Sequence, residues 1–213
     1  MQLFAEKGSS QVSMSDLAAA AGVARGTVHN NLTSPEAFFQ QIAHELADDM
    51  HARVMATAGL IADPVVRLSL GIRFYIRRAH EEPHWGRFMV RFAMSEQSLQ
   101  SLWRGQPTQD LATAHAAGRF NFRQEQLPFV IGFIASVALG GILMVLEGHR
   151  TWRQAGSDAA EFVFKALGMA PDEARSLAEI ELPPLVSPAT APPKPRAPSS
   201  QTRQVVGKRP KRP

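Results

Sequence analysis

The chain has 213 residues, of which 45% are hydrophobic; it contains no cysteine and carries a formal net charge of +4. This length allows one fold of two parts, and the lack of cysteine excludes disulfides and thiolate metal sites. The N-terminus shows no basic, apolar, small-residue signal series, so we expect a cytoplasmic protein.

Residues 13–22 predict a short helix with clear signals at both ends. Ser13 is a suitable N-cap, and Asp16, three positions on, can complete a capping box. Gly22 is expected to end the helix, because glycine adopts a left-handed conformation cheaply. Val23 would then fill the turn that follows.

A second short helix is predicted over 24–32, with Val28 and Leu32 facing inward. Its other side chains are small, polar or rich in hydrogen-bond donors, which suits a helix that enters the major groove of DNA. The residues expected to face outward are Arg25, Gly26, Thr27, His29, Asn30 and Asn31.

Ser34 and Pro35 begin a third helix, predicted over 35–57, with a capping residue followed by proline at the first helical position. Apolar residues then recur at helical spacing. The side chains expected to form its buried stripe are Phe38, Ile42 and Leu46.

Residues 3–45 resemble the DNA-binding domain of the TetR family of transcriptional repressors. The resemblance rests on blocks at matching spacing: Leu3-Phe4-Ala5-Glu6-Lys7-Gly8, Ser13-Met14-Ser15-Asp16-Leu17-Ala18, Ala21-Gly22-Val23, Gly26-Thr27-Val28, Ser34 and Glu36-Ala37. An ordinary helical hairpin with an alanine-rich face is the alternative interpretation.

The resemblance implies a homodimeric, ligand-responsive repressor that binds a palindromic operator in double-stranded DNA. The two 24–32 helices would enter successive major grooves about 34–36 Å apart. Arg25 and Asn30 would contact base edges, and Thr27 a base methyl group or a phosphate. Ser13 and His29 would contact phosphates. A small apolar effector would release the DNA.

Three departures from the family pattern bear on DNA binding. The family usually has an aromatic residue at the position of His29 and a phosphate-contacting lysine at that of Pro35. Its first helix is longer, so Met1–Lys7 supplies only the last part, and the domain is expected to be truncated. Residues 1–45 also hold two cations and four acids, although phosphate neutralisation supplies much of the affinity of DNA-binding proteins. A degenerate member that dimerises and binds ligand without specific DNA binding is therefore an alternative.

Beyond residue 45 the apolar spacing predicts helices and almost no strands, so the expected fold is all-α. The predicted helices span 64–82, 83–93, 98–104, 107–117, 126–147, 155–167 and 171–178. The resemblance assigns 1–45 to the DNA-binding domain, 46–182 to an effector-binding and dimerisation domain, and 183–213 to a tail.

Residues 127–146 contain no charge and are long enough to cross a bilayer. Gly132, Ser136 and Gly140 recur every four residues, a strip that lets helices approach closely. We expect a helix buried on all sides, packed beside 155–167 and the partner's equivalent pair in a four-helix interface, without a membrane. A membrane-tethered regulator is the alternative.

Aromatic residues concentrated in the middle helices predict an apolar ligand pocket. The candidate pocket residues are Phe74, Trp85, Phe88, Phe92, Trp103 and Phe120. Four arginines could steer an anionic ligand or lie on solvated helix surfaces: Arg73, Arg77, Arg78 and Arg91.

Catalytic motifs are missing from the sequence: there is no Gly-rich phosphate loop, no GxSxG and no HExxH. The histidines are isolated or separated by Pro83, so we expect no metal and no cofactor. An enzyme built on the same helical bundle ranks last among the alternatives.

The tail, 183–213, holds seven of the 23 cations, nine of the 15 prolines and no acid, which leaves 1–182 with 16 cations against 19 acids. Such a segment is predicted to be disordered. It either solubilises the protein or adds non-specific affinity for DNA.

Overall fold

The computed structural model describes residues 1–95 and 105–186. Every regular element within these ranges is helical, as the all-α prediction required. The predicted helix 98–104 and most of the predicted tail lie outside the described residues.

The N-terminal part contains four short elements. They are α1 (Gln2–Lys7), the 3₁₀ turn η1 (Ser9–Gln11), α2 (Met14–Ala21) and α3 (Arg25–Asn31). Helices α2 and α3 pack against each other across the turn at Gly22, whose φ of 66° is left-handed as predicted.

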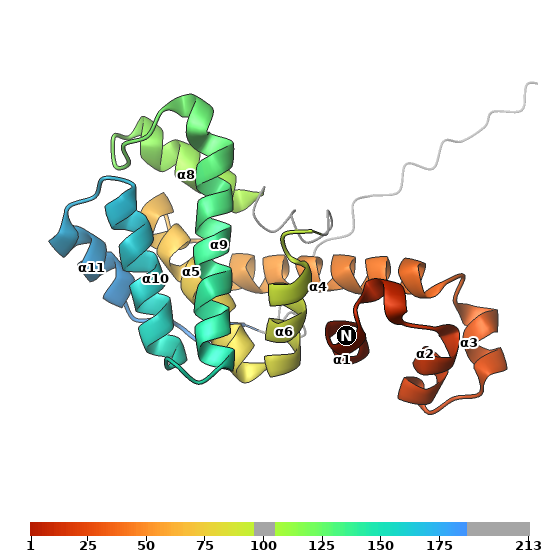
Figure 1. Ribbon diagram of the computed structural model, residues 1–213. Coiled ribbons are helices and arrows are strands. Elements are labelled where there is room, and N and C mark those ends of the chain that lie inside the picture. The colour runs from red at the N-terminus through yellow and green to blue at the C-terminus, as the bar shows by residue number, and fades with distance from the viewer. Residues whose placement is uncertain (96–104, 187–213) are drawn as a thin grey trace, which may run out of the picture.

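Helix α4 (Pro35–Ala58) is the long element that links this N-terminal part to the rest of the molecule. Figure 1 shows it running from α2 and α3 on one side into the helical core on the other. The predicted cap is confirmed, because the Ser34 hydroxyl accepts a hydrogen bond from the Ala37 amide at 3.1 Å.

The buried stripe of α4 differs by one residue from the prediction. The three residues predicted to form the stripe are only half-buried; they are Phe38, Ile42 and Leu46. Other side chains of α4 are almost fully buried. These buried residues are Phe39, Ala43, Ala47 and Met50. Two of them are alanines, whose small side chains let neighbouring elements approach α4 closely, so size was a poor guide to burial.

The core is a bundle around α5 (Pro64–Glu81), which contacts most of the other core helices. Asp63 caps α5 through bonds from the amides of Val65 and Val66. The other core elements are α6 (Pro83–Phe92), α8 (Gln106–Ala116), η2 (Gln124–Gln126), α9 (Leu127–Leu146), α10 (Trp152–Ala166) and α11 (Pro171–Glu179).

Helix α10 begins three residues earlier than predicted. Thr151 and Gln154 form a capping box, in which the Thr151 hydroxyl accepts from the Gln154 amide. This signal was present in the sequence as a threonine followed three positions later by glutamine.

Candidate DNA-binding surface and effector cavity

The start of α2 is held by a compact set of hydrogen bonds. The Ser13 hydroxyl accepts from the Asp16 amide at 3.2 Å, and the Ser13 amide donates to the Asp16 carboxylate at 2.9 Å, which confirms the capping box. The Ser13 hydroxyl also donates to this carboxylate at 2.9 Å. Lys7 of α1 contacts the same carboxylate at 2.7 Å. The hydrogen bonds from Lys7 and Ser13 lower the pKa of Asp16 from 3.8 to about 2. Because this hydroxyl already serves the cap, Ser13 offers DNA little hydrogen-bonding capacity.

The outer face of α3 is open to solvent. All six residues predicted to face outward are exposed, while Val28, at 6% exposure, fixes the helix to α2. The Arg25 Nε lies 3.4 Å from the His29 Nε2, and the Asn31 amide donates to the Thr27 carbonyl at 2.8 Å. Val23 is 43% exposed, so the prediction that it fills the turn was wrong.

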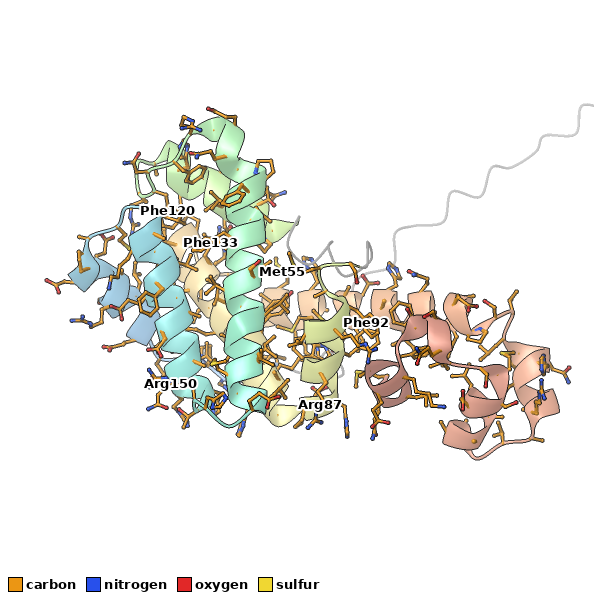
Figure 2. All side chains as sticks on the ribbon, in the orientation of Figure 1. Met55, Arg87, Phe92, Phe120, Phe133 and Arg150 are labelled. Atoms are coloured by element: carbon orange, nitrogen blue, oxygen red, sulfur yellow. The ribbon has the colours of Figure 1, made fainter. Side chains whose placement is uncertain are left out.

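An aromatic cluster joins the N-terminal part to the core. We call it the junction cluster and define it as Phe4, Phe38, Phe39, Phe88 and Phe92. The Phe39 ring is 5.2 Å from Phe4, 5.5 Å from Phe88 and 4.8 Å from Phe92, measured between centroids. Rings from α1, α4 and α6 therefore meet in one packed contact. Figure 2 labels Phe92, one of the rings that α6 contributes.

Arg91 of α6 reinforces this junction. Its Nη1 donates to the carbonyl oxygens of Ala5 at 2.7 Å and Glu6 at 3.0 Å, at the end of α1. Gly8 follows at φ 94°, and a Cβ there would meet the Arg91 guanidinium at 2.8 Å. The approach of Arg91 thus depends on glycine at position 8.

A cavity of about 60 Å³ lies further along α4, between α4, α5, α8 and α9. Most of its wall is apolar or lacks a side chain, and Met55 reaches it from α4 (Figure 2). The wall residues of this kind are Val54, Met55, Ala58, Gly59, Leu68, Gly71, Ile72, Pro107 and Ile134.

One side of the cavity is polar, formed by Arg67, Gln106 and Asp110, which we call the polar corner. The Asp110 Oδ1 accepts from Arg67 Nη2 at 2.5 Å, from Arg67 Nε at 3.1 Å and from Gln106 Nε2 at 2.9 Å. Arg67 also donates to the carbonyls of Ile61 and Ala62. Hydrogen bonding to Asp110 raises the pKa of the Arg67 guanidinium.

The predicted pocket residues lie elsewhere. None of the five that the structure describes lines this cavity, and Trp103 is outside the described residues. Phe88 and Phe92 belong to the junction cluster, and Phe120 stacks on Phe164 at 5.8 Å between centroids. Phe74 is fully buried in the core. Aromatic rings fill space well, so here they close the core, and the cavity is bordered by smaller side chains.

Trp85 contacts a residue that lines the cavity. Its ring is 6.0 Å from that of Tyr75, which lines the cavity, and the Arg78 guanidinium lies 4.7 Å from its centroid. The Trp85 Nε1 is buried without a hydrogen-bond acceptor among the described residues. Burial raises the pKa of the Tyr75 hydroxyl well above its usual range.

The four arginines proposed to steer an anion bind protein groups. Arg73 donates to the Ile180 carbonyl, Arg77 pairs with Glu81, and Arg78 pairs with Asp49 at 2.7 Å. Arg91 binds α1, as described above. Solvation on a helix surface is wrong for Arg73 and Arg78, which are 8% and 3% exposed. Arg91 is exposed, and ligand steering stays a prediction, since Arg73 and Arg77 line a second cavity beside α10 and α11. Desolvation lowers the pKa of Arg73, which is 8% exposed.

Helix α9 is buried on one side only, so the expectation of burial on all sides does not hold within a protomer. It is the helix that is long and apolar enough to cross a membrane in the described part of the chain, with 39% of its most apolar window buried. Its inner side packs against α5, α6 and α10. A Cβ at Gly141 would meet Ile76 at 2.5 Å, so glycine permits this approach of α9 to α5.

The outer side of α9 is apolar. Phe129 is 77% exposed, and Phe162 on the adjacent α10 is 63% exposed. On α9, a Cβ at Gly132 or Gly140 would meet nothing within 4 Å. The predicted small-residue strip thus faces outward in the protomer.

A helix-turn-helix on a short N-terminal domain, joined by one long helix to a helical core with a cavity, defines a DNA-binding transcription regulator. Two family models support this: residues 1–42 match "Bacterial regulatory proteins, tetR family", and residues 63–180 match "Tetracyclin repressor-like, C-terminal domain". The chain therefore belongs to the TetR family, as its sequence predicted.

Solved structures share this fold. RolR in complex with resorcinol has a TM-score of 0.67 and 21% identity over 86% of this chain and 91% of that chain. A TetR family transcription regulator from Shewanella sp. PV-4 has a TM-score of 0.63 and 20% identity over 78% and 92%. The fatty acid degradation regulator FadR from Bacillus halodurans has a TM-score of 0.63 and 15% identity over 79% and 92%. No curated protein matches the chain.

Proposed function

We propose that the protein is a cytoplasmic, homodimeric repressor that leaves its palindromic operator when a small apolar effector binds. The observation that carries this proposal is that α4 takes part in two contacts. Its N-terminal half packs in the junction cluster beside the DNA-binding part, and its C-terminal half forms a wall of the cavity. The RolR structure with resorcinol is consistent with a small ligand in this fold.

The outer face of α3 is the proposed DNA-reading surface. Arg25, Thr27 and Asn30 are exposed on it. Arg25 and Asn30 would contact base edges, and Thr27 a base methyl group or a phosphate. Gly26 leaves room for the sugar-phosphate backbone, and His29 and Asn31 complete the surface.

Dimerisation through the outer side of α9 would place two such surfaces on one DNA duplex. An exposed apolar helix face of this kind marks an interaction site. Gly132, Ser136 and Gly140 would allow the partner's α9 to approach closely. Gly140→Arg should therefore give a monomeric mass by light scattering. Asp172→Arg on the exposed side of α11 is the matched control, and an unchanged mass for Gly140→Arg contradicts this interface.

Signal transfer would use α4 as a lever. A ligand that enlarges the cavity must displace Met55 and its neighbours on α4, and the junction cluster would carry that displacement to α3. The ligand then shifts the population away from the DNA-binding conformation, provided that it binds the two conformations with different affinity.

The test is selection of binding sites from random double-stranded DNA by the full chain. We expect enrichment of an inverted repeat whose half-sites are about one helical turn apart. Arg25→Ala should relax base preference at one position of each half-site, while Arg87→Ala on α6 should leave the preference intact. Failure to enrich any sequence contradicts the repressor proposal.

A second candidate is a family member that binds ligand and dimerises without reading DNA. The observation that favours it is the charge of residues 1–45, which hold two cations and four acids. One of the two cations, Lys7, is already paired with Asp16. A dimeric, ligand-binding protein that enriches no sequence in the same selection would support this candidate.

A further inference from the structure

The Asp110 carboxylate is unevenly satisfied. The residue is 3% exposed, and Oδ1 accepts all three hydrogen bonds of the polar corner. Oδ2 accepts none from the described residues. Oδ2 retains some exposure, because among the described residues only Trp85 Nε1 is a fully buried side-chain polar atom without a partner. Since Asp110 lines the cavity, this oxygen is a ready acceptor for a ligand that carries a donor.

The charge of the cavity limits what that ligand can be. Among the described residues that line it, Arg67 and Asp110 carry the formal charges, and they neutralise each other at 2.5 Å. An anionic ligand would meet Asp110, and a cationic ligand would meet Arg67 at the same corner. An uncharged donor avoids both repulsions, and a hydroxyl group is the simplest uncharged donor.

The remaining wall sets the shape of the ligand body. Apart from Tyr75 and His51, it is built from apolar side chains and glycines, which suit an apolar ligand body. The volume of about 60 Å³ is smaller than the roughly 150 Å³ of a protein cavity that holds benzene. A single ring would therefore have to displace Met55, whose unbranched side chain adapts readily.

We propose that this cavity binds an uncharged, single-ring or similarly small molecule whose hydroxyl group donates a hydrogen bond to Oδ2 of Asp110. This inference deepens the proposed effector function and rests on it for its biological meaning. Ligand binding itself can be measured without DNA, so the two proposals can fail separately.

The experiment uses calorimetry on the DNA-free full chain with five probes: phenol, cyclohexanol, toluene, benzoate and benzylammonium. We expect phenol or cyclohexanol to bind at least tenfold more tightly than toluene, because a hydrogen bond to a charged acceptor has that effect. Phenol against cyclohexanol distinguishes an aromatic from an aliphatic alcohol. Toluene binding as tightly as phenol, tighter binding of either ion, or no binding of any probe overturns the proposal.

Two variants test separately the hydrogen bond to Asp110 and the space that the cavity offers a ligand. In Asp110→Asn, the amide oxygen should take the place of Oδ1 and accept from Arg67 and Gln106. The NH₂ group then takes the place of the acceptor Oδ2, so the preference for phenol over toluene should fall about tenfold. In Gly71→Ala, the new methyl group enters open space in the wall. Binding of phenol and toluene should weaken together, while the melting temperature rises because alanine favours helix.

His80→Ala on the exposed side of α5 is the control for Gly71→Ala, since it also introduces the helix-favouring alanine into α5 but lies outside the cavity wall. It should leave both affinities unchanged. If Asp110→Asn does not fold, the ranking of the five probes on the unaltered chain and the Gly71→Ala result still decide the matter. An unchanged preference in a folded Asp110→Asn protein removes Asp110 from recognition.

Discussion

The two ends of α4 are packed in opposite ways. Near its N-terminus, Phe39 is 1% exposed and touches aromatic rings from α1 and α6. Near its C-terminus, Met55 is half-buried and borders open space in the cavity. One end of a single helix is therefore fixed by packing, while the other has room to move.

The difference suggests how a small ligand acts over a distance. A packed aromatic contact resists deformation because every ring is surrounded, so displacement there moves the joined elements as a unit. A cavity wall lacks partner atoms on one side and yields at a lower cost. Under the proposed function, movement at the cavity end would reach α1 through the junction cluster, and α1 contacts α2, which packs on α3.

The largest expected effect comes from breaking the fixed end. Phe39→Ala should lower the free energy of unfolding by about 3–5 kcal/mol, because it empties the centre of the junction cluster. Urea denaturation followed by circular dichroism measures this. Phe39→Leu, which keeps most of the volume, should cost less than about 1.5 kcal/mol. A loss under 1 kcal/mol for the alanine variant would be inconsistent with a fixed end.

At the cavity end, the polar corner is the feature to break. Arg67→Met should cost about 3 kcal/mol, because it leaves the buried Asp110 carboxylate without its cation. Arg150→Met is the matched control, since Arg150 pairs with Asp158 at 3.2 Å with both side chains about half exposed. That pair should contribute less than about 1 kcal/mol. An equal loss of unfolding free energy in both variants would show that the Arg67–Asp110 pair contributes no more than an exposed ion pair.

A smaller effect is expected where α6 holds α1. Arg91→Ala removes the two hydrogen bonds to the α1 carbonyls and should cost about 1 kcal/mol by thermal denaturation. Arg87→Ala on the same helix, an exposed position without such bonds, should stay within about 0.5 kcal/mol. A null result for Arg91→Ala would leave aromatic packing as the main contact between α1 and α6.

The smallest effect concerns the acid stability of the DNA-binding part. The folded pKa of Asp16 is about 2, below its ordinary 3.8. Its contribution to stability is therefore complete above pH 3.8 and is lost as the pH falls through about 2. Carboxyl NMR titration checks the value. Lys7→Met should raise the pKa of Asp16 toward 3.8, and an ordinary pKa in the unaltered chain would contradict the Lys7 contact.

Local sequence signals predicted the helix starts well. Ser13 with Asp16 and Ser34 with Pro35 each cap the helix they were expected to cap. These bonds join groups within three residues of each other, so they are encoded by neighbouring side chains. The TetR resemblance rests on the same short-range features, which is why both family and architecture could be predicted.

The cavity could not be predicted in this way. Arg67 and Asp110 meet across 43 residues of sequence, and neither stood out among many charged residues on amphipathic helices. The aromatics of α6 were visible, but whether a ring lines a cavity or fills a junction depends on which helix lies opposite.

The sequence by itself determined the family, the helical elements and the outward-facing residues of α3, because helical periodicity and capping are local properties. Only the tertiary structure decided that Phe39 is fully buried while Phe38 is half-buried, that the arginines of α5 bind protein groups, and that the cavity is mostly apolar with one polar corner. Those outcomes depend on close packing between segments far apart in the chain, where the shapes of all the neighbours act together.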